Sequence, residues 1–91
     1  MRPEPSSCPR LRPGCRLSDN PAQESTLLMP EGILELAGPG LKIVELCDGS
    51  RTFAAMLEVL GSTFPNAPKD RIETDTAAYL ERLRDRGAVE F

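Results

Sequence analysis

The three cysteines are the residues best suited to nucleophilic or metal chemistry in this chain, because the sequence contains no histidine. They stand at Cys8, Cys15 and Cys47, and no two of them form a Cys-x-x-Cys pair. Histidine is the usual general base near neutral pH and a common metal ligand, so the group that would activate a cysteine nucleophile is missing. An odd, widely spaced set of cysteines favours reduced thiols in a cytoplasmic protein over a disulfide framework or a zinc site. We therefore expect no catalytic residue, no bound metal and no cofactor.

The chain has 91 residues, which suffices for one small domain with a single core. Its formal net charge is −3, yet residues 1–16 carry four arginines and one glutamate, so the remainder is acidic. An acidic body argues against nucleic acid as a partner, since Lys and Arg contacts to phosphate supply most of that affinity. No apolar run resembles a signal peptide or a membrane span. We therefore expect a cytoplasmic location and no contact with a membrane.

The N-terminal residues differ in composition from the rest. Residues 1–13 hold four of the nine prolines together with serines and arginines. Such a stretch cannot bury enough surface to offset the entropy lost on ordering, so a flexible arm is predicted here. The folded domain is then expected to span residues 14–91.

An antiparallel β-hairpin is predicted after this arm. Its strands are expected over residues 25–29 and 33–36, and they are joined by Pro30-Glu31-Gly32. Proline fixes its own φ and glycine tolerates a positive one, which suits a tight reversal. A further short strand, predicted over residues 15–17, would extend the hairpin to three strands.

Three helices are predicted to follow. The first covers about residues 41–47, with Cys47 as a small core residue, and ends at Asp48-Gly49 because glycine accepts a left-handed cap. The second begins after Thr52, a suitable N-cap, and the third covers 69–86 with an acidic start and a basic end. This order predicts an α+β, winged-helix-like fold: a short N-terminal antiparallel β-hairpin or three-stranded sheet followed by a three-helix bundle.

With these elements in place, the chain resembles the PqqD family, the parent of the leader-peptide recognition domains known as RiPP recognition elements. The resemblance extends from Cys8 to Val89, and one departure is Gly40, where the family commonly has an alanine. No single motif is specific, and the order and spacing of all of them indicate the family. The motifs are Pro9, Arg16-Leu17, Leu27-Leu28, Pro30-Glu31, Ile43, Leu46-Cys47-Asp48-Gly49, Arg51-Thr52, Asp75, Leu80, Leu83 and Gly87.

This resemblance implies a peptide chaperone without catalytic activity. Members of the family bind the precursor peptide PqqA and present it to PqqE, a radical S-adenosylmethionine enzyme of pyrroloquinoline quinone biosynthesis. In related domains the leader peptide adds as an antiparallel strand to the outer hairpin strand and packs against the third helix. A recognition domain of another modified-peptide pathway has the same features, so that alternative stays open.

A peptide-binding edge is accordingly expected on the strand over 33–36. Strand addition gives affinity through main-chain hydrogen bonds and specificity through alternate side chains. The period of two places Leu34 and Leu36 toward the helices, while Ile33 or Glu35 flanks the incoming peptide. The alternative is a hairpin that is simply part of the core. A free edge can also pair with a second copy of the chain, so a homodimer stays open.

On the third helix, four residues fall close to one stripe beside the apolar seam: Asp75, Tyr79, Arg82 and Arg86. Tyr79 could stack on a peptide side chain, and the two arginines could pair with carboxylates of the leader. Each has a structural alternative. Tyr79 could be a core aromatic, Asp75 could form a local salt bridge, and the arginines could be a solvated face that complements the helix dipole.

Two other classes of protein fit the pattern less well. A winged-helix DNA-binding domain would need a basic recognition helix, whereas residues 69–86 hold five basic and five acidic side chains. A cysteine enzyme would need a base beside Cys15 or Cys47, and no histidine is available.

Overall fold

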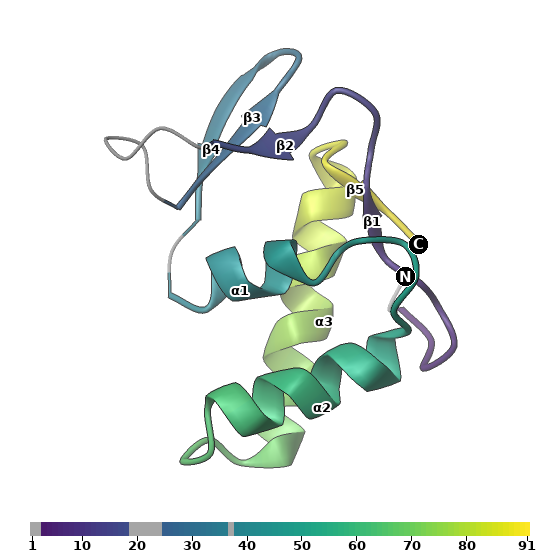
Figure 1. Cartoon of the computed structure of the whole chain (residues 1–91), viewed down its shortest axis with the longest axis vertical. Helices are drawn as coiled ribbons and strands as arrows, with labels where there is room; N and C mark the ends of the chain where they lie inside the picture. The colour runs from purple at the N-terminus through teal and green to yellow at the C-terminus, as the bar shows by residue number, and fades with distance from the viewer. Residues whose placement is uncertain (1–2, 19–24, 37) are drawn as a thin grey trace.

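The computed structural model describes residues 3–18, 25–36 and 38–91, and it places a small sheet at one end of a cluster of three helices (Figure 1). The sheet contains β2, β3 and β4 in that order, all antiparallel, and a separate short pair joins β1 to β5. This arrangement confirms the predicted α+β fold. The element bounds are β1 Arg10–Leu11, β2 Arg16–Leu17, β3 Thr26–Met29, β4 Gly32–Glu35, α1 Gly40–Glu45, α2 Phe53–Thr63, α3 Lys69–Asp85 and β5 Val89–Glu90.

The predicted hairpin is formed by β3 and β4. Met29 lies opposite Gly32 across a turn made by Pro30 and Glu31. Gly32 has a φ of +149°, a conformation that a side chain disfavours. On the other side of β3, the short strand β2 pairs with it as predicted. The middle strand of the sheet is therefore β3, and β4 lies at an edge.

One hydrophobic core joins the sheet to all three helices. It is centred on α3, which runs through the middle of the molecule in Figure 1. None of the helices in the described ranges is long and apolar enough to cross a membrane. The buried core residues are Leu27, Leu36, Ile43, Val44, Leu46, Cys47, Phe53, Met56, Leu60, Ala77, Leu80, Leu83, Ala88 and Val89.

The helix boundaries follow local signals in the sequence. Thr52 caps α2 as predicted, since its hydroxyl oxygen accepts a hydrogen bond from the amide of Ala55 at 3.1 Å. The helix α1 ends at Glu45, two residues before the predicted end. Beyond it, the side chain of Asp48 accepts hydrogen bonds from the amides of Ser50 and Arg51, at 3.0 and 3.1 Å. Gly49 has a φ of +79°. These contacts form the turn that separates α1 from α2.

A flexible arm was expected at the N-terminus. In the structure, residues 3–12 are instead packed against the rest of the protein. The carbonyls of Pro5 and Ser7 accept hydrogen bonds from the first two amides of α2, at 3.1 and 2.7 Å. Pro9 is buried, and β1 pairs with β5 near the C-terminus. The composition was misleading because backbone carbonyls, which every residue has, satisfy the free amides of a helix start. Met1 and Arg2 lie outside the described residues.

Candidate functional site

The outer edge of β4 presents main-chain groups with no partner strand in the described part of the chain. The amide of Leu36 donates a hydrogen bond to the carbonyl of Ser25 at 2.7 Å, which fixes the phase of the ladder between β3 and β4. Bonded and non-bonded pairs alternate along antiparallel strands, so Leu34 is bonded to β3, whereas Ile33 and Glu35 are not. The N–H and C=O groups of Ile33 and Glu35 therefore point outward from the sheet.

The side chains of this strand alternate between the two faces as predicted. Leu36 is only 5% exposed and Leu34 packs half-buried against the core. Ile33 is 58% exposed, and Leu28 lies opposite it on the outer face of the hairpin. The side chains of Leu34 and Leu36 thus hold the strand in place, while Ile33 and the exposed Glu35 are accessible beside the free edge.

A groove of about 510 Å³ lies between α1, α2 and α3. Three of the four residues expected on the third helix line it, namely Asp75, Tyr79 and Arg82. The fourth, Arg86, does not line it and forms the C-terminal cap of α3, one turn beyond Arg82. The remaining lining residues are Pro39, Gly40, Ile43, Leu60, Phe64, Ala67, Arg71, Ile72, Thr76 and Ala78.

Tyr79 packs across the start of α1. A Cβ atom added to Gly40 would lie 2.7 Å from Cζ of the Tyr79 ring, so the missing side chain makes room for the tyrosine. The guanidinium of Arg82 lies 5.6 Å from the ring centroid, in cation–π range. Burial raises the pKa of Tyr79 and Arg82 partly opposes this, so near neutral pH the hydroxyl is a neutral hydrogen-bond donor. Tyr79 is partly a packing residue and partly a wall of the groove.

Asp75 forms an ion pair with Arg71, one helical turn earlier, at 3.3 Å. This is the local salt bridge that the sequence left open as an alternative. The groove also contains Arg71, Phe64 and Gly40, which were not predicted from the sequence. An Arg four residues before an Asp on one helix was an available signal for the pair. No local signal exists for Phe64 and Gly40, because tertiary packing brings them to α3.

The cysteines lack the surroundings of a catalytic nucleophile. Cys8 is exposed, Cys15 is partly exposed and Cys47 is buried. Burial, together with the neighbouring charge of Asp48, raises the pKa of Cys47 to about 12, so its reactive thiolate is scarce at neutral pH. Within the described residues, no group of three or more His, Cys, Asp or Glu side chains is placed to hold a metal ion.

Known proteins are similar to this chain in sequence and in fold. The family model for coenzyme PQQ synthesis protein D (PqqD) matches residues 24–89. A PqqA binding protein of Azotobacter vinelandii is 39% identical over 84 residues, covering 91% of this chain and 89% of the relative. A PqqA binding protein of Pseudomonas aeruginosa strain UCBPP-PA14 is 40% identical over 80 residues, covering 87% and 85%.

A solved structure is also similar. It is the solution NMR structure of the PqqD truncation of Methylobacterium extorquens PqqCD, a functional and stand-alone RiPP recognition element. The two chains share 29% sequence identity and superpose with a TM-score of 0.78, over 97% of this chain and 94% of the other. The similarity covers the sheet and all three helices, so the edge of β4 and the face of α3 belong to the shared fold.

Proposed function

Because the chain belongs to the PqqD family, we propose that it is a non-catalytic peptide chaperone that binds the precursor peptide PqqA and presents it to the radical S-adenosylmethionine enzyme PqqE. The relatives from Azotobacter and Pseudomonas are named PqqA binding proteins, which supports PqqA as the partner. Presentation to PqqE rests on the family resemblance. A cytoplasmic location goes with that role.

The observation that carries this proposal is the free edge of β4. An incoming peptide strand can bond the outward N–H and C=O groups of Ile33 and Glu35, as in strand addition. Leu34 and Leu36 anchor the edge from the core side, and the exposed faces of Ile33 and Glu35 contact alternate side chains of the peptide. On α3, Asp75, Tyr79, Arg82 and Arg86 supply polar and aromatic contacts to the same peptide.

The same edge would also allow a homodimer to form. Two β4 strands can pair edge to edge, because their outward main-chain groups are complementary to those of another strand. Such a pairing occupies the groups that the peptide needs. A dimer of this kind is therefore expected to dissociate when PqqA binds, which analytical ultracentrifugation with and without the peptide would detect.

A pair of substitutions at one position tests the binding mode. Ile33→Pro removes an outward N–H that makes no bond within the hairpin, and edge strands tolerate proline. Ile33→Val keeps the N–H and the branched side chain, so it is the matched control. Losing one main-chain hydrogen bond costs about 1 kcal/mol or more, so calorimetry with synthetic PqqA of Azotobacter vinelandii should give a dissociation constant at least about fivefold weaker for Ile33→Pro.

Comparable affinities for the two variants would contradict strand addition at this edge. Circular dichroism of both proteins in the absence of peptide checks that the fold survives the proline. Absence of binding by wild-type protein, with or without PqqE, would assign this chain to a leader peptide other than PqqA.

A further inference from the structure

We propose that Gly14 is a positioning residue for peptide binding, because it lets a turn over residues 12–15 support the tip of the hairpin formed by β3 and β4. Through this support the turn sets where the free edge of β4 lies relative to α3. The inference rests on the proposed function, since it concerns how the same peptide site is held. It goes beyond that function, because neither the turn nor the hairpin tip is itself a contact of the peptide.

The turn over residues 12–15 has a defined shape. The amide of Cys15 donates a hydrogen bond to the carbonyl of Arg12 at 3.0 Å, which closes a β-turn with Pro13 and Gly14 at its centre. Gly14 has a φ of +89°. Proline at the second position and a positive φ at the third are features of a type II turn, which favours glycine at the third position. The pair Pro13-Gly14 therefore suits this turn.

One side of the turn is bound to the segment that follows α3. The amide of Arg12 donates a hydrogen bond to the carbonyl of Ala88 at 2.9 Å. The thiol of Cys15 donates a weaker one to the carbonyl of Gly87, at 3.9 Å. The strand β1 ends just before the turn and pairs with β5. These contacts fix the turn to the C-terminal end of α3.

The other side of the turn touches the hairpin tip. A Cβ atom added to Gly14 would lie 2.9 Å from Cγ and 3.6 Å from Cδ of Pro30, so the close approach to the proline ring requires the missing side chain. Pro30 belongs to the turn that joins β3 to β4. In Figure 1 the connection from β1 to β2 passes between the hairpin tip and the C-terminal end of α3. Residues 12–15 therefore form a spacer between these two parts of the molecule.

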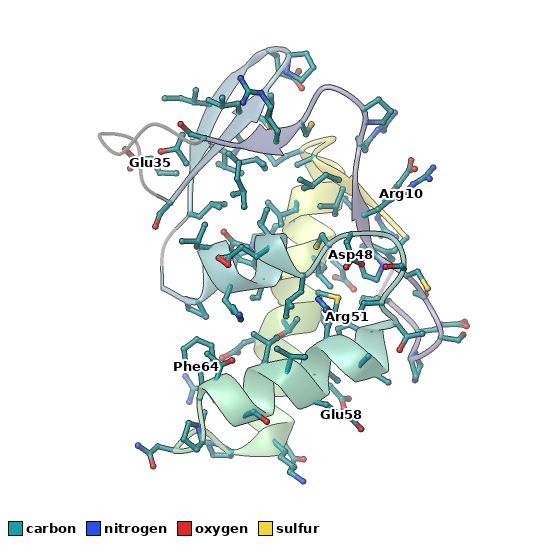
Figure 2. All side chains as sticks on the ribbon, in the orientation of Figure 1. Arg10, Glu35, Asp48, Arg51, Glu58 and Phe64 are labelled. Carbon is teal, nitrogen blue, oxygen red and sulfur yellow. The ribbon has the colours of Figure 1, made fainter. Side chains whose placement is uncertain are left out.

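This spacer matters because the hairpin is otherwise held to the helices by side chains. Among the described residues, the backbone hydrogen bonds of β3 and β4 stay within the sheet and the residues that directly extend it. Leu27, Leu34 and Leu36 pack in or against the core. Figure 2 shows Arg10 and Glu35 on opposite sides of the view, so the turn that follows β1 supports the tip without covering the free edge. A peptide that contacts both β4 and α3 binds more tightly when these elements are correctly placed before it arrives.

Substitutions on both sides of the contact test this role. Gly14→Ala places a methyl group against the ring of Pro30 and should push the hairpin tip away from α3. The peptide then loses at least the equivalent of one hydrogen bond, so calorimetry with synthetic PqqA of Azotobacter vinelandii should give a dissociation constant at least about fivefold higher. Pro30→Ala removes both ring carbons that the methyl group meets. In that background, adding Gly14→Ala should change the dissociation constant by less than about twofold.

Gly87→Ala is the matched control for backbone strain. Gly87 has a φ of +78°, close to that of Gly14, and an added Cβ there would meet nothing within 4 Å. Alanine is therefore strained at both positions, and urea unfolding should show that both variants lose stability. Only Gly14→Ala should also weaken the binding of PqqA. Both Gly14 and Pro30 are exposed, so their variants should fold, which circular dichroism without peptide checks.

The bond between the turn and the end of α3 has a separate test. Arg12→Pro removes the N–H that donates to Ala88, so the spacer loses its fixed side. Binding of PqqA should weaken by more than about twofold, the error within which independent effects add. Arg12→Gln keeps this N–H while it removes the charge, and should leave the affinity unchanged. An equal effect of the two substitutions would trace the loss to charge and would overturn the role of this bond.

The outcomes separate this inference from strand addition. Wild-type affinity in Gly14→Ala, while Ile33→Pro weakens binding, would overturn the positioning role and leave the proposed function standing. An equal loss of affinity from Gly14→Ala with and without Pro30→Ala would trace the effect to strain within the turn, which would also overturn the positioning role. Equal affinity of wild-type protein, Ile33→Pro and Gly14→Ala for PqqA would overturn strand addition and the positioning role together.

Discussion

Gly40→Ala is expected to destabilise the protein, although alanine normally favours a helix. The added Cβ would lie 2.7 and 3.2 Å from two ring carbons of Tyr79, and closer still to the hydroxyl oxygen. Such overpacking costs about 1–3 kcal/mol. The gain from replacing glycine with alanine is about 0.5–1 kcal/mol in a helix interior, and smaller at the first residue of α1. We therefore expect the free energy of unfolding to fall by about 1–2 kcal/mol.

Urea unfolding followed by circular dichroism measures this change, and Gly61→Ala is its control. Gly61 lies in α2 and an added Cβ there would meet nothing within 4 Å, so that variant should be stabilised by about 0.5–1 kcal/mol. In a Tyr79→Leu background the ring is absent. The fall in the free energy of unfolding caused by Gly40→Ala, measured relative to Tyr79→Leu alone, should therefore be about 1 kcal/mol smaller than it is in the wild-type background. A Gly40→Ala protein as stable as wild type, with unchanged affinity for PqqA, would refute the placement of Tyr79 against α1.

The remaining predictions concern parts of the molecule away from the groove. Cys47 should resist thiol reagents at pH 8 until the protein unfolds, while the exposed Cys8 reacts at once, and rapid labelling of Cys47 in the native protein would contradict its burial. Because burial raises the pKa of Cys47 to about 12, the contribution of this thiol to stability is complete below pH 9 and is lost as the pH rises toward 12. The hydrogen bond from the Ser50 amide holds the pKa of Asp48 below its ordinary value of 3.8, so the stability that it contributes is present above that pH and lost as the pH falls through the lower value. Acid unfolding should therefore depend less on pH in Asp48→Asn, and identical acid profiles would show that this carboxylate contributes nothing. Deletion of residues 1–8 removes two backbone acceptors from the start of α2, so it should lower the free energy of unfolding by about 2 kcal/mol without changing the affinity for PqqA. Deletion of residues 1–2 keeps both acceptors and is the control. Equal stability of the two truncated proteins in urea would contradict this role of the N-terminal residues.

Local sequence signals predicted the hairpin and the start of α2 because their causes are local. Alternation along β4 indicated that Leu36 faces the core and that Ile33 is exposed, and both were confirmed by their burial. Thr52 indicated the start of α2 through its capping hydroxyl. In each case the determining contact lies within a few residues along the chain.

The pairing of β1 with β5 could not be predicted in this way. It joins Arg10 to Glu90 across nearly the whole chain, and a two-residue strand has no periodicity to detect. The same holds for the groove. Tyr79 was a candidate from its place on α3, but its contact with Gly40 and the position of Phe64 depend on how three helices pack. The expected peptide-binding roles of these side chains stay predictions until they are measured with the peptide.

The most direct test of strand addition is amide hydrogen exchange of β4, measured by NMR with and without synthetic PqqA of Azotobacter vinelandii. In the free protein, the amides of Leu34 and Leu36 should be protected, because Leu34 is bonded to β3 and Leu36 donates to the carbonyl of Ser25 just before β3. The amides of Ile33 and Glu35, which point away from β3, should exchange rapidly. When the peptide binds, Ile33 and Glu35 should become protected as well. Peptide binding that leaves the exchange of Ile33 and Glu35 unchanged would contradict the account.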